Sequence, residues 1–190
     1  MRAVFLVGLL AACGGGSSHA TCNASDYPCG PYGFAQGAVI ADLTVMGQRD
    51  SDGNGSAVDN PVVPIHLHDY FHDSTLTALV IIIGAENCVP CQNEQPDLVV
   101  TYNKHHPQAA FLEAIVQGAG GAPADQSVID GWATNYALPF DLTADPTGAL
   151  SQYYPANTFP SAMAIRTRDM TIVYQVVGPA DGLDAALTQL

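Results

Sequence analysis

The sequence predicts an α/β fold with a mixed central sheet, helices on both faces and an N-terminal β extension. Thr77 to Gly84 (TALVIIIG) is a continuous apolar, β-branched run, the pattern of a strand buried on both faces. Strand-like and helix-like segments alternate after it, which favours parallel strands joined by crossover helices. Ser161 to Arg166 and Thr171 to Val177 then form an expected hairpin, which makes the sheet mixed.

The segments before the buried strand are expected to form a loop and two strands. Cys22 to Gly37 is rich in Pro, Gly and Asn without helical or strand periodicity, which is typical of a loop. Ala38 to Met46 alternates in part and is expected to be one strand. Asp50 to Gly55 (DSDGNG) is expected to be a turn. Pro61 to Leu67 is expected to be an edge strand, because its prolines would remove hydrogen bonds from a central one.

The segments after the buried strand alternate between helix and strand. Helices are expected at Glu94 to His106, Asp125 to Ala137, Thr147 to Tyr154 and Asp181 to Leu190, and strands at Ala110 to Gln117 and Phe140 to Leu142. In the second of these helices, apolar residues recur along one face, as in a helix packed on a sheet. That face comprises Val128, Ile129, Trp132 and Tyr136.

The composition is that of an acidic, folded domain. The chain has 190 residues, with 18 Asp and Glu against five Lys and Arg, and a formal net charge of −13 at pH 7. Nucleic-acid binding is excluded as a function class, because it requires a basic surface to meet phosphates. Apolar residues make up 48% of the chain, which is too many for a disordered protein. The length fits one domain plus a short appendage.

The N-terminus has the composition of an export signal. Arg2 precedes a short apolar run, Ala3 to Ala12, which is too short to span a bilayer. Leu10-Ala11-Ala12-Cys13 resembles the lipobox of bacterial lipoproteins, in which cleavage leaves the cysteine as the first mature residue and lipid is attached to its sulfur. The resemblance implies a signal peptide at 1–12, lipidation of Cys13, and a flexible lipid-anchored tether at 13–21. The protein would then lie in the cell envelope of a bacterium, facing the periplasm or the exterior.

Export places the other four cysteines in oxidising surroundings, where disulfides persist. Cys22 and Cys29 are close in the chain, and a bond between them would close an eight-residue loop. The chain-entropy model gives such a bond about 2.5 kcal/mol of stabilisation. We therefore expect a structural disulfide that clips the loop at 22–37, with a second redox pair as the alternative.

Cys88-Val89-Pro90-Cys91 follows the buried strand and begins a helix. The N–H groups and the positive dipole end of a helix N-terminus favour a thiolate over a thiol. Two intervening residues allow the second cysteine to reach the sulfur of the first. Cys88 can then attack a disulfide and Cys91 can resolve the mixed disulfide, so the pattern predicts a redox pair that needs no cofactor.

The segment Cys88 to Pro96 (CVPCQNEQP) resembles the active-site helix of thioredoxin-like proteins. It is most similar to C-x-P-C-x-x-E-x-P of the TlpA/ResA-like exported thiol-disulfide oxidoreductases. Phe159-Pro160-Ser161 matches the family's cis-proline before a strand. The resemblance implies a thioredoxin fold over 38–190, with Cys88 as nucleophile, Cys91 as resolving cysteine and Pro160 docking the substrate. It implies a redoxin lipoprotein that exchanges disulfides with protein substrates and with a thiol redox partner.

Two positions depart from the family. The residue before the first cysteine is usually Trp, and here it is Asn87. Thioredoxin itself has a buried acid six residues before that cysteine, and here the position is Ile82. Proton handling is therefore expected to fall to Glu86 or to solvent.

Other interpretations of these cysteines remain open. An inert Cys88–Cys91 bond would make the chain a non-catalytic thioredoxin-fold binding lipoprotein, and Asn87 motivates that alternative. Half of a zinc site would need a second cysteine pair with ligand spacing. A peroxiredoxin would need P-x-x-x-T-x-x-C, whereas Ile81 and Ala85 occupy the Pro and Thr positions.

No bound metal is expected, but two weaker alternatives exist. His66 and His68 would face the same way on a strand, so a copper-handling protein could use them with the cysteines. Asp50 to Gly55 matches the first half of an EF-hand calcium loop. Pro61, however, stands where that loop needs a bidentate Glu, so a turn explains the segment better.

Overall fold

The computed structural model describes residues 26–190, and its elements follow the expected alternation. The strands are β1 (Thr44–Gln48), β2 (Val63–His66), β3 (Ala78–Ala85), β4 (Ala109–Gln117), β5 (Asp141–Ala144), β6 (Ser161–Arg166) and β7 (Thr171–Val177). The α-helices are α1 (Leu67–His72), α2 (Val89–His105), α3 (Gln126–Tyr136) and α4 (Leu183–Leu187), and the 3-10 turns are η1 (Ala119–Gly121) and η2 (Ser151–Tyr153). The predicted signal peptide, the tether, Cys13 and Cys22 lie outside the described residues.

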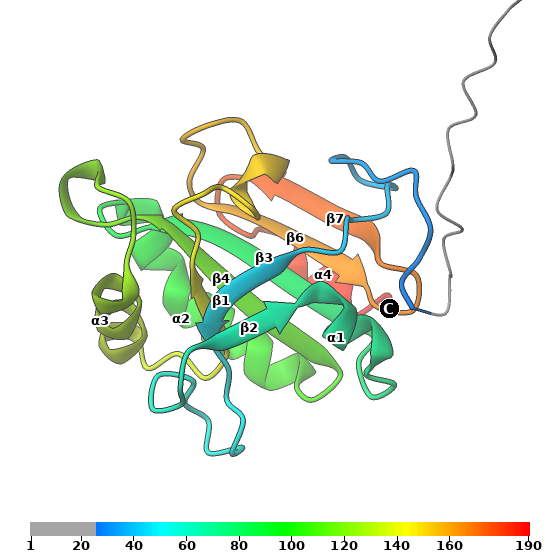
Figure 1. Cartoon of the computed structure of the whole chain (residues 1–190), viewed down its shortest axis with the longest axis horizontal. Helices are drawn as coiled ribbons and strands as arrows, with labels where there is room; N and C mark the ends of the chain where they lie inside the picture. Colours follow the sequence, from blue (N-terminus) through cyan, green and yellow to red (C-terminus); the bar gives the residue numbers. More distant parts are fainter. Residues whose placement is uncertain (1–25) are drawn as a thin grey trace, which may run out of the picture.

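One seven-stranded sheet runs through the molecule in the order β2-β1-β5-β4-β3-β6-β7 (Figure 1). The central strands β3, β4 and β5 are parallel. β6 and β7 are antiparallel to β3 and to each other, and β1 and β2 extend the other edge in antiparallel pairing. The mixed sheet with an N-terminal β extension is confirmed.

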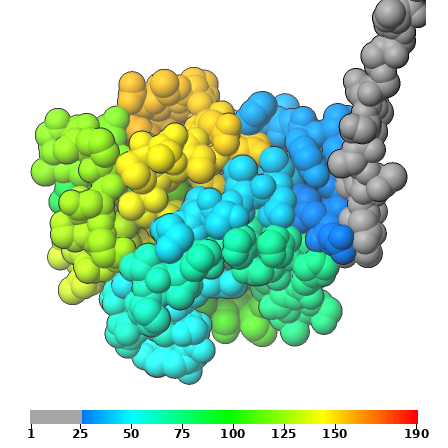
Figure 2. All heavy atoms as spheres, viewed as in Figure 1, coloured from blue at the N-terminus to red at the C-terminus, as the bar shows by residue number. Residues whose placement is uncertain are grey.

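The sheet has an apolar core on each face, and β3 contributes to both. Val80 and Ile82 point toward α2, α3 and α4, while Leu79, Ile81 and Ile83 point to the opposite face. That second face is covered by α1, η2 and the N-terminal segment, which spread over the near side of the molecule in Figure 2. β3 is therefore buried on both faces, as its sequence predicts. No helix within 26–190 is long and apolar enough to cross a bilayer.

The predicted strand Ala38 to Met46 is wrong as a single strand, because the segment serves both edges of the sheet. At its start, Gly37 N–H donates to the Ile172 carbonyl and Ile172 N–H donates to the Ala38 carbonyl, along the outer side of β7. The chain then crosses one face and becomes β1, which pairs with β5 (Figure 1). Two short pairings, one with β7 and one with β5, replace the expected strand, because the residues between them cross the face of the sheet.

Four helices within 26–190 differ from the prediction. α1 (Leu67–His72) begins at the last residue of the predicted edge strand, and no helix is predicted there. α2 begins at Val89 rather than at Glu94, because Cys88 caps it and Pro90 fits its first turn. The helix expected at Thr147 to Tyr154 is only the turn η2, because Gly148 has a positive φ of 75°. Gly182 likewise has φ 87° and delays the terminal helix to Leu183. A left-handed residue cannot continue an α-helix, so both glycines set a helix boundary.

Candidate active site

Cys88 and Cys91 lie at the N-terminus of α2, immediately after the buried strand β3. They form a disulfide, and Cys91 N–H donates a hydrogen bond to Cys88 Sγ at 3.1 Å. Pro90 occupies the first turn, where a missing N–H costs no helical hydrogen bond. Cys91 is fully buried, whereas Cys88 is half-buried and the adjacent Val89 is 60% exposed. A partner sulfur can therefore approach Cys88 rather than Cys91.

Pro160 lies at the same end of the sheet as the cysteine pair. The Phe159–Pro160 peptide bond is cis. Ser161, the next residue, pairs with Ile83 near the carboxyl end of β3, from which the chain continues to Cys88. Gly178 N–H donates to the Pro160 carbonyl at 2.8 Å and joins the end of β7 to this segment. The three residues that the sequence resemblance implies for the site thus lie at one end of the sheet.

Glu86 and Asn87 connect β3 to the cysteines at the surface. Asn87 is exposed, and its Nδ2 donates to the Gly118 carbonyl at 3.5 Å. Glu86 is half-buried, and its backbone carbonyl accepts from Gln92 Nε2 at 2.7 Å. The single tryptophan, Trp132, is buried under the sheet on α3, so it does not replace the aromatic residue missing at Asn87.

A buried acid that sequence reasoning missed lies beneath the cysteines. Glu113 on β4 is fully buried, and its Oε1 accepts from Gln95 Nε2 at 2.9 Å. The same Nε2 donates to the Cys91 carbonyl at 3.0 Å. Burial raises the pKa of Glu113 to about 8, although Gln95 and Trp132 oppose the rise. The available signal was one acidic residue in the apolar strand sequence AFLEAIVQ.

A second acid, Glu94, lies one helical turn after Cys91. It is 8% exposed, and its Oε2 accepts from the Ala180 backbone N–H at 3.2 Å, in the loop after β7. Burial and the nearby Asp181 raise the pKa of Glu94 to about 7, against that hydrogen bond. Two carboxyl groups near the disulfide therefore change charge close to neutral pH.

Comparison with known proteins identifies the fold. No protein-family model and no curated protein sequence matches the chain. Solved structures do match, among them the pneumococcal exposed lipoprotein thioredoxin (Etrx1) of Streptococcus pneumoniae, at 20% identity and TM-score 0.58 over 79% of this chain and 100% of that one. A DsbF homologue from Corynebacterium diphtheriae matches at 14% identity and TM-score 0.60, over 80% and 87%. StoA from Bacillus subtilis matches at 15% identity and TM-score 0.53, over 77% and 97%.

The chain has a thioredoxin fold. In this thioredoxin fold the cysteine pair lies at the start of α2, directly after the buried strand β3, and the cis Phe159–Pro160 bond precedes β6.

The charges of this thioredoxin fold are distributed unequally between its two ends. The described residues include four of the five Lys and Arg, and all four lie away from the cysteines. They are Arg49 after β1, Lys104 in the last turn of α2, Arg166 at the end of β6 and Arg168 in the β6–β7 turn. Glu86, Asp125 and Asp181 lie at the cysteine end. A partner approaching Cys88 therefore meets negative charge.

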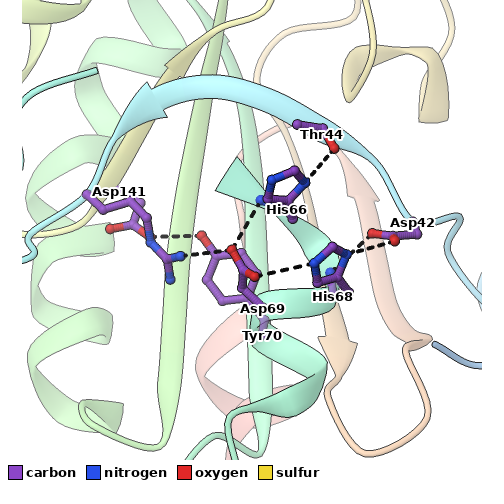
Figure 3. A network of polar contacts seen from close by, with 8 residues as sticks. Asp42, Thr44, His66, His68, Asp69, Tyr70 and Asp141 are labelled. Carbon is purple, nitrogen blue, oxygen red and sulfur yellow. Dashed lines mark hydrogen bonds and ion pairs between the residues drawn. The ribbon is translucent and has the colours of Figure 1, made fainter. Parts of the chain in front are cut away.

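The two histidines considered for copper are not placed as predicted. His66 ends β2, but His68 lies in α1, so they do not face the same way along one strand. Their rings stack at 4.9 Å, with His66 Nδ1 hydrogen-bonded to Thr44 and His68 Nδ1 to Asp42 (Figure 3). Within 26–190, no group of three or more His, Cys, Asp or Glu side chains is arranged to hold a metal.

Beside these histidines, Arg49 joins α1 to the start of β5. Its guanidinium pairs with Asp141 at 3.2 Å and with Asp69 at 3.3 Å, and it lies over the Tyr70 ring. Tyr70 Oη donates to Asp141 at 2.8 Å (Figure 3). The network borders a cavity of about 470 Å³ at the end of the sheet opposite the cysteines. Its acids already have partners, which favours a structural role.

The remaining predicted disulfide is only partly within the described residues. Cys29 is disulfide-bonded. Cys22 lies outside 26–190, so its pairing with Cys29 stays a prediction.

Proposed function

We propose that the protein is a thiol-disulfide oxidoreductase that exchanges disulfides with protein substrates and a thiol redox partner through Cys88 and Cys91. The Cys88–Cys91 disulfide at the N-terminus of α2 carries this proposal. Of these two cysteines only Cys88 is partly exposed. The cis Phe159–Pro160 bond lies at the same end of the sheet. This is the geometry that a two-step exchange requires.

The chemistry follows from the position of each sulfur. In the reduced protein, the helix N-terminus favours the Cys88 thiolate, which attacks a substrate disulfide and releases one substrate thiol. Cys91 then attacks Cys88 Sγ in the mixed disulfide and releases the second. Two electrons pass to the substrate, and the Cys88–Cys91 bond forms. Pro160 is proposed to hold the substrate backbone beside Cys88 during both steps.

The test is exchange with a disulfide-bonded protein substrate, followed by thiol alkylation and mass spectrometry. Cys88→Ser should abolish exchange, and Cys91→Ser should accumulate a mixed disulfide with the substrate. A chain carrying Cys22→Ser and Cys29→Ser is the matched control and should retain exchange. Exchange by Cys88→Ser would contradict the proposal, and a Cys91→Ser chain that traps no partner would favour the binding lipoprotein.

The reduction potential of the pair gives an independent check. A reversible couple between about −120 and −270 mV is expected for a catalytic pair. A pair that stays oxidised below about −300 mV would be a structural disulfide and would contradict the proposal.

We also propose that the protein is exported and anchored to the envelope membrane of a bacterium through lipid on Cys13. Leu10-Ala11-Ala12-Cys13 and the Gly/Ser segment after it support this proposal. Labelled fatty acid should be incorporated into the wild-type chain and not into Cys13→Ser, which should leave the membrane fraction. Equal labelling of both chains would refute the anchor.

A further inference from the structure

Glu113 is a buried acid with no structural requirement that explains its charge. Its side chain is fully buried, and Oε2 has no hydrogen-bond partner among the described residues. A buried carboxyl without full pairing destabilises a fold, and a Leu or Met of similar size would fill the space without that penalty. Packing therefore does not explain the Glu113 carboxyl, and a chemical role would.

The position of Gly84 shows how the carboxyl reaches the cysteine. A Cβ at Gly84 would lie 3.5 Å from Glu113 Oε1 and 3.9 Å from Cys91 Cβ. Both atoms thus line the same space beside the Gly84 backbone, which stays open because the residue has no side chain. Gln95 links the two residues, because its Nε2 donates hydrogen bonds to both Glu113 Oε1 and the Cys91 carbonyl.

We propose that Glu113 exchanges a proton with Cys91 during each disulfide exchange. The inference rests on the proposed function and assigns a further residue to it. Cys91 is fully buried, and burial in apolar surroundings disfavours its thiolate, so its proton needs a nearby acceptor.

The step balances as follows. When Cys91 attacks the mixed disulfide, the bond between Cys88 and the substrate sulfur breaks and the Cys88–Cys91 bond forms. The Cys91 proton passes to the Glu113 carboxylate, and the substrate sulfur leaves with the electron pair. In the reverse reaction, a thiolate attacks Cys88, Cys91 leaves as a thiolate, and neutral Glu113 returns the proton.

The electrostatics suit a proton that moves both ways. With its pKa raised to about 8, the Glu113 carboxylate is a stronger base than an exposed carboxylate, so proton transfer from a buried thiol costs less free energy. α2 supplies the two titratable groups that face Glu113, namely Cys91 and Glu94. α3 supplies the Trp132 indole, which does not titrate.

The test separates the two cysteines by time. The reduced full chain is mixed with Ellman's reagent, an aromatic disulfide whose released thiolate is coloured. The first, bimolecular release reports attack by Cys88, and the second, unimolecular release reports resolution by Cys91. Glu113→Gln should leave the first phase unchanged and slow the second at least tenfold at pH 8, where a large share of the Glu113 carboxyl is ionised. Alkylation and peptide mapping of quenched samples assign each phase to its cysteine.

The pH profile distinguishes a proton acceptor from a packing role. The second phase of the wild type should follow the ionisation that Trp132 fluorescence reports, and Glu113→Gln should lose that transition in both signals. Asp130→Asn, an exposed acid on the helix of Trp132, is the matched control and should keep it. Glu113→Asp should restore part of the second phase if Glu113→Gln folds poorly.

Each outcome has one meaning. An absent first phase would refute the proposed function itself. A normal first phase with an unchanged second phase in Glu113→Gln would overturn the role of Glu113. Glu86→Gln or Glu94→Gln slowing the second phase, with Glu113→Gln unaffected, would overturn it and assign the proton to that residue.

Discussion

Glu113 on β4 is the parallel pairing partner of Ile82 on β3, six residues before Cys88. The pairing places a carboxyl in the middle of the sheet, directly under α2, where water does not reach it. Its neighbours on the strand are apolar, and no cation pairs with it among the described residues; Gln95 Nε2 donates a hydrogen bond to its Oε1. The stability of the fold should therefore depend on whether this carboxyl is ionised.

The free energy of unfolding should fall as the pH rises from about 4.5 to about 8. Burial raises the pKa of Glu113 above its unfolded value, so the neutral form favours the native state and stability is lost as the group ionises. Glu94, with a pKa of about 7, acts in the same direction over the lower part of this range. Glu113→Gln should flatten the dependence above pH 7, as urea unfolding measured across pH would show. An unchanged slope in this variant would contradict the burial argument.

Gly84→Ala should destabilise the protein by about 1–3 kcal/mol, because the added methyl overpacks the space between Glu113 and Cys91. The new Cβ would lie 3.2 Å from Ile115 Cδ1, closer than ordinary contact. Gly131→Ala is a matched control, since Gly131 is helical and has open space around its Cβ position. It should stabilise α3 by about 0.5–1 kcal/mol. Equal effects of the two substitutions would argue against a crowded Gly84.

Arg49→Met should cost about 1–3 kcal/mol at neutral pH, because it leaves the Asp141 carboxylate half-enclosed without its cation. Arg49 holds the pKa of Asp141 down against the effect of burial. Without it that pKa should rise, so the deficit should be smallest in acid, where Asp141 is neutral in both proteins. Arg168→Met, which removes an exposed arginine, should change little. Thermal unfolding at several pH values would reveal a pH-independent deficit if this account were wrong.

Exchange should favour cationic disulfides, since the charges around Cys88 are negative and the basic residues lie at the other end. Cystamine should react faster than oxidised glutathione at low salt. Raising the ionic strength from about 0.01 M to about 1 M shortens the Debye length from about 30 Å to about 3 Å, and the ratio of the two rates should fall several-fold. Hydroxyethyl disulfide, which is neutral, should show little salt dependence. A salt-independent ratio would rule out steering.

The site residues that the sequence predicts are those recognisable from the residues next to them in the chain. Cys88 and Cys91 follow a strand and begin a helix, and Pro160 directly precedes a strand. The order of elements along the chain is therefore enough to place all three. Glu113 was not predicted, because the resemblance places the buried acid at Ile82 and no sequence pattern gives the register that pairs Ile82 with Glu113. The crossing of residues 37–48 was missed for a similar reason, since its hydrogen bonds join residues more than ninety positions apart.

The segment 37–48 forms hydrogen bonds near both edges of the sheet. It binds Ile172 of β7 near one edge and β5 near the other. It is made early in synthesis, yet its pairing partners, β5 and β7, are made late. Closing the sheet is therefore a long-range event that comes after most of the chain exists, which slows folding. Until it happens, two rows of unpaired backbone groups stay open to strands of other molecules. A truncation that removes these residues should therefore lead to aggregation before it leads to loss of chemistry.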